Sequence, residues 1–202
     1  MNLRILITDY MNFSRRRDRM QTNIYFVRHA HSTYTPDELG RPLSHKGCMD
    51  TERMTESLKH EDIHYVLASP YKRAIQTVQG IADWIGSEIM IEDGFRERQL
   101  AENPVENFDQ AITRLWQNPA FFYEGGESNL AAQKRGVDAT LQVLQTYKGK
   151  NIVIGTHGNI MVLIMNHFDA QYDYSFWKEL AMPDVYRMTF DGLKLKEVKR
   201  IN

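Results

Sequence analysis

The sequence contains only one cysteine, Cys48, among its 202 residues. A single cysteine can form neither an intrachain disulfide nor a thiolate metal cluster, so a reducing cytosol suits the chain best. The spacing from Cys48 to Arg53 does not match the loop of a cysteine phosphatase. We therefore predict that Cys48 is a small buried side chain and has no chemical role.

Long apolar runs and an excess of charge are also missing. No apolar run approaches the roughly 18 residues that a membrane span needs, and the amino terminus lacks the pattern of a secretory signal. The formal net charge of -1 argues against nucleic acid as the main partner. We therefore expect a cytoplasmic protein that binds neither membrane nor nucleic acid. The oligomeric state stays open.

The length suits one domain, and the 42% hydrophobic content is enough to bury a core. Residues 1–21 include the basic run Ser14–Arg19 and are expected to form a peripheral N-terminal extension. Residues 22–202 are expected to form a single α/β domain. An aromatic-rich stretch around 103–126 is expected to be a helical insertion within that domain.

Short apolar segments alternate with amphipathic ones along the domain. This alternation predicts an α/β fold: a three-layer sandwich with a mostly parallel central sheet and helices on both faces. Ser69 is expected to cap one helix, with Pro70 at its first position. The expected strands are 24–27, 65–68, 88–91 and 151–155, the expected helices are 44–59, 70–85, 128–147 and 160–168, and a hairpin is expected over 185–198.

Polar side chains follow several of the expected strands. Arg28 and His29 end the first, Arg73 follows the second, Glu97 the third and His157 the fourth. The carboxyl ends of parallel strands meet at one edge of a sheet, where ligands bind. Arginine offers a fork of donors suited to phosphate, and a neutral imidazole is a nucleophile. Together these groups could bind a phosphoryl dianion and stabilise its transfer, while a carboxylic acid protonates the leaving alkoxide.

The order and approximate spacing of several motifs resemble the histidine phosphatase superfamily, the phosphoglycerate-mutase-like proteins. The resemblance implies a phosphoglycerate-mutase-like fold with His29 as the phosphorylated nucleophile and Arg28 and Arg73 as phosphate clamps. It also implies His157 as a phosphate contact and Glu97 as the proton donor, with no metal and no cofactor. The motifs are Arg28–Ser32, Leu43–Gly47, Ser69–Thr77, Phe95–Arg98, Gly126–Ser128 and Thr156–Asn159.

The chain departs from the family pattern at three places. Ala30 replaces the glycine that usually follows the nucleophile, and His31 replaces the usual glutamate or glutamine. Leu100 and Ala101 stand where the family has a glycine after the acidic residue. The last departure leaves Glu102 and Glu127 as alternative proton donors.

The function expected from these motifs is that of a metal-independent phosphomonoesterase, a histidine acid-type phosphatase. It would act in two steps, through a phosphohistidine, on a small phosphorylated metabolite. One alternative is a phosphoglycerate mutase-type phosphotransferase, for which the chain from Met20 onward is short. Another is a non-catalytic regulator that binds a phosphorylated ligand. A metallohydrolase with His29, His31 and His157 as zinc ligands is a further class, but neighbouring arginines oppose metal binding.

Overall fold

The computed structural model describes residues 21–201 of the chain. The expected extension over residues 1–21 therefore lies outside the described residues, apart from Gln21. Gln21 is the first residue of strand β1 and pairs with Asp191 of the neighbouring strand β5. The described part of β1 thus includes the last residue of the expected extension.

A six-stranded sheet runs through the centre of the molecule in the order β3-β2-β4-β1-β5-β6. The first four strands in this order are parallel to one another, whereas β5 and β6 form an antiparallel hairpin at one edge. The expectation of a mostly parallel sheet is confirmed. The strands are β1 (Gln21–Arg28), β2 (Tyr65–Ala68), β3 (Ile89–Ile91), β4 (Asn151–Thr156), β5 (Asp184–Asp191) and β6 (Lys194–Ile201).

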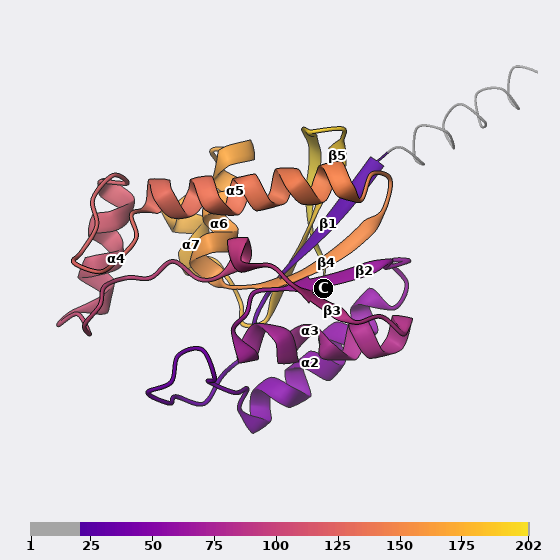
Figure 1. Ribbon diagram of the computed structural model, residues 1–202, viewed down its shortest axis with the longest axis horizontal. Coiled ribbons are helices and arrows are strands. Elements are labelled where there is room, and N and C mark those ends of the chain that lie inside the picture. The colour runs from indigo at the N-terminus through magenta and orange to yellow at the C-terminus, as the bar shows by residue number, and fades with distance from the viewer. Residues whose placement is uncertain (1–20, 202) are drawn as a thin grey trace, which may run out of the picture.

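Helices cover both faces of the sheet, which confirms the three-layer sandwich (Figure 1). Helices α2 (His45–Leu58) and α3 (Lys72–Ile85) lie on one face, and α5 (Asn129–Thr146) and α6 (Gly158–Phe168) lie on the other. Successive side chains of a strand point to opposite faces. Accordingly, every residue from 24 to 27 in β1 is buried. Ile24 and Phe26 belong to one hydrophobic core, and Tyr25 and Val27 belong to a second, separate core. This is why the strand reads as one unbroken apolar run.

Close packing between β4 and α3 brings the start of α3 to the carboxyl end of the sheet. A Cβ atom added at Gly155 of β4 would lie 2.7 Å from the carbonyl oxygen of Ala74 in the first turn of α3. Only a glycine allows this approach. The neighbouring Arg73 is thereby held beside the end of β4.

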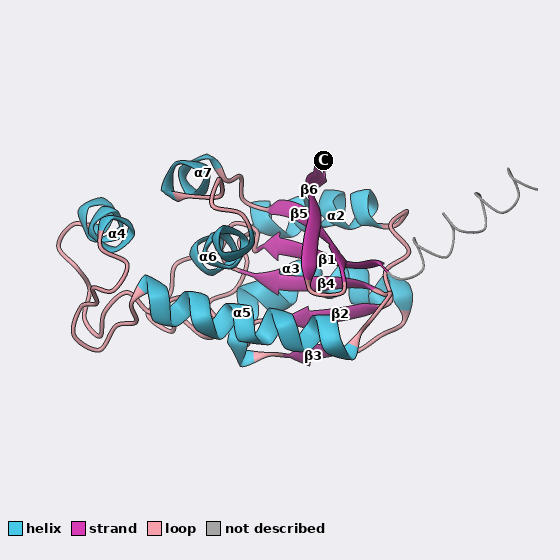
Figure 2. Ribbon diagram, turned by 90° about the horizontal axis from the view of Figure 1, so that it is seen from above, coloured by secondary structure: helices cyan, strands magenta, loops and turns pink. Residues whose placement is uncertain are grey.

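Two short helices lie beyond the carboxyl ends of the strands. Helix α4 (Phe108–Gln117) falls inside the expected insertion, and α7 (Tyr174–Glu179) was not expected from the sequence. Figure 2 shows both helices on the side toward which β1 and β4 point. The side chain of Asp173 accepts hydrogen bonds from the first turn of α7, so an N-cap signal was present in the sequence.

Two local predictions were wrong. Helix α3 begins at Lys72 rather than at Pro70, and Tyr71 is its N-cap residue. Ser69 does not cap the helix because its hydroxyl group bonds a histidine across the sheet, as described below. Cys48 is exposed, because the buried face of α2 runs through Gly47, Asp50 and Met54 and excludes it.

No helix within residues 21–201 is both long and apolar enough to cross a membrane.

Candidate active site

The side chains that follow the strands meet at the carboxyl end of the sheet. His29 comes directly after β1 and His157 directly after β4, and these two strands are neighbours. The backbone N–H of His29 donates to the carbonyl oxygen of Thr156 at 2.9 Å, which keeps the two strand ends in register. The centroids of the two imidazole rings lie 5.2 Å apart. The sheet therefore places both histidines in one site.

His29 is buried and held in one tautomer. Its Nδ1 lies 2.8 Å from the carbonyl oxygen of Ala30. A carbonyl oxygen can only accept, so Nδ1 carries the proton and Nε2 keeps its lone pair. Burial lowers the pKa of His29 to about 4, and the cationic Arg73, Arg28 and Arg41 add to this effect. The ring is neutral near pH 7, as a nucleophile must be.

Arg73 points its guanidinium group at the unprotonated nitrogen of His29, Nε2. Its Nε donates to His29 Nε2 at 3.3 Å, and its Nη1 donates to the carbonyl oxygen of Glu38 at 2.8 Å. The guanidinium also stacks over the Tyr71 ring, 4.6 Å from the ring centroid. Arg73 is buried, so a cation with fixed donors faces the atom expected to be phosphorylated.

Arg28, the last residue of β1, is bound to the backbone of the segment that precedes β5. Its Nη1 donates to the carbonyl oxygens of Leu180 and Ala181 at 2.9 and 3.1 Å. Its Nε is buried and has no hydrogen-bond partner in the described part of the chain. A Cβ atom added at Gly158 would lie 3.0 Å from this Nε. Arg28 is therefore tied to the segment before β5 and lies against the first residue of α6.

His157 is fully buried, and its Nε2 lies 2.7 Å from Ser69 Oγ. Its Nδ1 has no partner among residues 21–201. The edge of the ring packs against Tyr71, with the two centroids 4.8 Å apart. Burial lowers the pKa of His157 well below its usual value, and the nearby His29 and Arg73 act in the same direction. His157 is thus a neutral imidazole with one free nitrogen.

Glu97 lies at the first turn of α6 and not on the surface beside Arg96. Its Oε1 accepts from the backbone N–H groups of Arg98 and Ile160 at 2.8 and 3.0 Å, and its Oε2 accepts from that of Asn159 at 3.1 Å. The positive end of a helix dipole and its free N–H groups suit a carboxylate. Glu97 is therefore bound to the backbone of Asn159 and Ile160, which follow His157 by two and three residues in the sequence.

The two alternative carboxylates have different surroundings. Both oxygens of Glu127 bind the guanidinium of Arg135 at 3.0 and 2.7 Å, and Arg135 also binds the carbonyl oxygens of Gly94 and Arg96. This network holds Glu127 in a structural position. Glu102 is exposed in the loop before α4. Of the three carboxylates, Glu97 is the one bound directly to the turn that follows His157.

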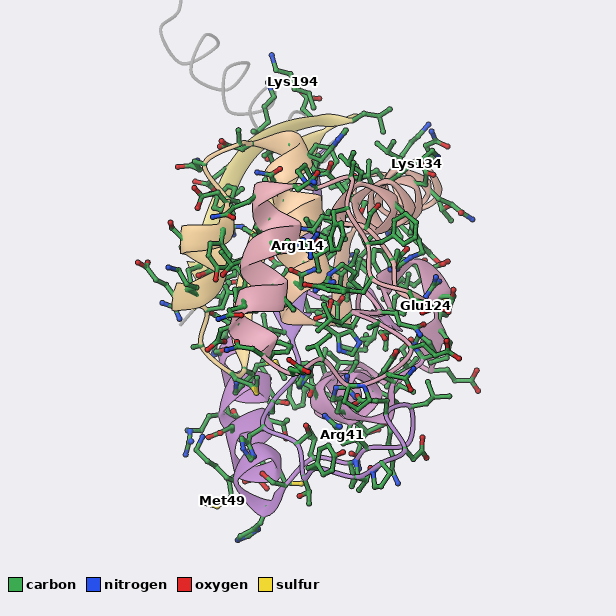
Figure 3. All side chains as sticks on the ribbon, turned by 90° about the vertical axis from the view of Figure 1, so that its left-hand side faces the viewer. Arg41, Met49, Arg114, Glu124, Lys134 and Lys194 are labelled. Carbon is green, nitrogen blue, oxygen red and sulfur yellow. The ribbon has the colours of Figure 1, made fainter. Side chains whose placement is uncertain are left out.

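Arg41 is a third arginine near the nucleophile that sequence reasoning missed. Its charge helps to lower the pKa of both His29 and Arg73. Its guanidinium group packs over the ring of Tyr34 and binds Glu38. Figure 3 looks onto this end of the molecule, where Arg41 lies below α4. Its position directly before the motif at 43–47 was the available signal.

Helix α4 reaches the site through one aromatic side chain. Trp116 donates from Nε1 to Asn159 Oδ1 at 3.2 Å. Tyr174 of α7 lies beside it, with ring centroids 6.0 Å apart, and bonds Thr113 through its hydroxyl group at 2.8 Å. The insertion and α7 thus hold each other next to the residue that binds Glu97.

His31 does not join the other two histidines. It is exposed, and its Nδ1 lies 2.8 Å from Ser44 Oγ. Within residues 21–201, no three His, Cys, Asp or Glu side chains are grouped so that they could share a metal ion. The arrangement expected for the zinc alternative is therefore not formed by His29, His31 and His157.

An α/β sandwich with two buried imidazoles and the buried guanidinium of Arg73 at the carboxyl ends of its parallel strands is the arrangement expected for the phosphoglycerate-mutase-like class. A family model described as histidine phosphatase superfamily, branch 1, matches residues 24–201. The chain belongs to this phosphatase superfamily, and the resemblance noted from its motifs is confirmed.

Individual relatives are distant but cover most of the chain. Phosphoglycerate mutase-like protein 4 of Arabidopsis thaliana is 29% identical over 154 residues, which is 68% of this chain and 67% of the relative. Putative phosphoserine phosphatase 2 of Hydrogenobacter thermophilus is 21% identical over 70% of this chain and 76% of its own length. The structure of phosphoserine phosphatase from Entamoeba histolytica in complex with 3-phosphoglyceric acid aligns with a TM-score of 0.74. It is 15% identical and covers 90% of this chain and 97% of its own.

Proposed function

We propose that this protein is a metal-independent phosphomonoesterase that acts on a small phosphorylated metabolite through a phosphohistidine at His29. The observation that carries the proposal is the hydrogen bond from His29 Nδ1 to the carbonyl oxygen of Ala30, because it leaves Nε2 as a fixed nucleophile. The donors of Arg73 face that nitrogen. The names of the relatives, which include phosphoserine phosphatases, support a small phosphate ester as the substrate.

In the first step, His29 Nε2 attacks phosphorus in line with the leaving oxygen. The P–N bond forms, the P–O bond to the alcohol breaks, and a proton from Glu97 goes to the departing alkoxide. Arg28, Arg73 and His157 hold the equatorial oxygens, whose charge spreads in the transition state. Arg28 ends β1, His157 follows β4, and Arg73 lies in the first turn of α3 after β2, which supports a site that is positioned before substrate binds.

In the second step, water attacks the phosphohistidine and gives its proton to Glu97. The P–N bond breaks, and inorganic phosphate leaves with His29 neutral again. Within residues 21–201, Oε2 of Glu97 accepts a single backbone N–H, which leaves a lone pair for this proton. The same side chain can therefore serve as acid in the first step and as base in the second.

The test is turnover of p-nitrophenyl phosphate, phosphoserine and 3-phosphoglycerate by the full chain, with and without a chelator. We expect phosphate release that the chelator does not affect, and a phosphoryl adduct on His29 that is seen by mass spectrometry after an alkaline quench. His29→Ala should abolish both, whereas His60→Ala, which removes an exposed histidine, should change neither.

Other outcomes of this experiment would overturn the proposal. Conversion of 3-phosphoglycerate to its isomer without phosphate release would show a mutase-type phosphotransferase. Tight binding of a phosphorylated ligand with no turnover would show a non-catalytic regulator. Loss of activity with the chelator would show a metal enzyme.

A further inference from the structure

Ser69 is a buried side chain to which the two-step reaction assigns no role. It follows β2, and its Oγ lies 2.7 Å from Nε2 of His157. Both residues are fully buried. A hydrogen bond between a hydroxyl and a neutral imidazole can run in either direction, and the direction decides which ring nitrogen carries the proton.

The partners of the Ser69 hydroxyl decide the direction. Among the described residues, two groups lie within hydrogen-bonding distance of its Oγ: His157 Nε2 and the backbone N–H of Tyr71 at 3.4 Å. The Tyr71 N–H is a donor and cannot receive the hydroxyl proton. If His157 also donated from Nε2, the hydroxyl proton would be buried without any acceptor, which is strongly unfavourable. The hydroxyl proton of Ser69 therefore points at His157 Nε2.

We propose that Ser69 is a positioning residue that keeps His157 in the tautomer with its proton on Nδ1, so that this ring nitrogen donates to the substrate phosphoryl group. This inference rests on the proposed function. Nδ1 of His157 is the ring nitrogen without a protein partner within residues 21–201. Its ring packs against that of the nucleophile His29 in an edge-type arrangement, with the centroids 5.2 Å apart and the planes inclined by 66°.

The tautomer matters because the phosphoryl group is an anion. An Nδ1–H group donates a hydrogen bond to a phosphoryl oxygen, whereas a bare Nδ1 would turn its lone pair toward the same oxygen. A doubly protonated ring would also donate from Nδ1. Burial keeps the pKa of His157 low, however, so the ring carries a single proton near pH 7. A single hydroxyl group, on the residue that follows the neighbouring strand β2, thus determines whether His157 attracts or repels the substrate.

The primary test is the tautomer of His157 in the wild-type full chain, measured by long-range ¹H–¹⁵N NMR of ¹⁵N-histidine-labelled protein. His157→Gln assigns the signal, and spectra are recorded alone and with orthovanadate. We expect the Nδ1–H form in both states. Finding the Nε2–H form or the imidazolium near neutral pH overturns the proposal. Because this measurement needs no turnover, its outcome is separate from that of the proposed function.

A double-mutant cycle tests the consequence for the reaction. Ser69→Ala should lower kcat/KM about 10- to 100-fold, since one donor to the transition state is lost in part of the molecules. In the His157→Ala background the same change should cost less than about twofold, because Ser69 acts through His157. Full loss in both backgrounds would instead show a general structural role and overturn the proposal.

A matched control removes another buried hydroxyl group. Thr140 in α5 is fully buried and donates to the carbonyl oxygen of Gly136 at 2.7 Å. Thr140→Val should leave kcat/KM and the His157 tautomer unchanged. Ser69→Ala should shift the tautomer toward Nε2–H, and an unchanged spectrum in that variant would overturn the proposal.

Discussion

Acid should destabilise this protein through His29 by an amount that the structure predicts. The pKa of His29 in the folded chain is about 4, against an ordinary value of about 6.5 in the unfolded chain. Between these values the unfolded state binds more protons, so stability rises with pH. The stabilisation is therefore fully present above about pH 6.5 and is lost as the pH falls toward 4. Stability falls with falling pH because burial and the positive charges of Arg73 and Arg28 disfavour the imidazolium form of His29 in the folded chain.

The size of the effect follows from the two pKa values. For a shift from about 6.5 to about 4, lowering the pH from about 7.5 to about 4.5 should cost about 2.5 kcal/mol of unfolding free energy through His29 alone. His29→Gln has no titrating group at this position. Urea unfolding followed by tryptophan fluorescence at both pH values should show a smaller loss in the variant, by about 2.5 kcal/mol.

The comparison with a second variant makes the result specific. His60→Gln removes an exposed imidazole just after α2 and should keep the full pH dependence of the wild type. If the wild type and His29→Gln differ by less than about 1 kcal/mol between the two pH values, His29 does not have the depressed pKa that burial beside cations requires. The proposed neutral nucleophile would then lose its physical basis.

Three further results are expected. Arg28→Ala and Arg73→Ala should each lower kcat/KM by about 10²- to 10³-fold; steady-state rates within tenfold of the wild type would contradict this. Gly155→Ala places a Cβ 2.7 Å from the Ala74 carbonyl oxygen and should cost about 1–3 kcal/mol in urea unfolding, so an unchanged midpoint would count against it. A chain that starts at Met20 should keep its melting transition and activity, and a collapsed transition would disprove a peripheral extension.

Much of the fold was determined by local sequence patterns. The apolar runs at 24–27 and 151–155 predicted strands, and the structure confirms both as β1 and β4. Ser128 caps α5, as a serine before an amphipathic run predicts. The alternation of strands and helices was enough to predict the three-layer sandwich. Parallel strands are joined by crossovers that usually contain a helix, and these helices cover the faces of the sheet. Helix α7, whose sequence pattern is weak, was not predicted.

The sequence also placed Arg28, His29, Arg73 and His157 at strand ends, but their roles stay predictions. That these side chains lie together was decided by the strand order, which puts β4 between β1 and β2. The hydrogen-bond partners of these side chains could not be predicted from the sequence. Ser69 looked like a helix cap because serine before proline is common there.

The surroundings of Glu97 show most clearly what only the tertiary structure decided. In sequence it is a glutamate between two arginines, a pattern that fits a surface ion pair as well as the proton donor that the motifs imply. In the folded chain its partners are backbone N–H groups, two of them in a helix more than sixty residues away. Secondary structure follows from the periodicity of neighbouring side chains, so it can be predicted from a single sequence. Long-range hydrogen bonds depend on how whole elements pack, and no local pattern carries that information.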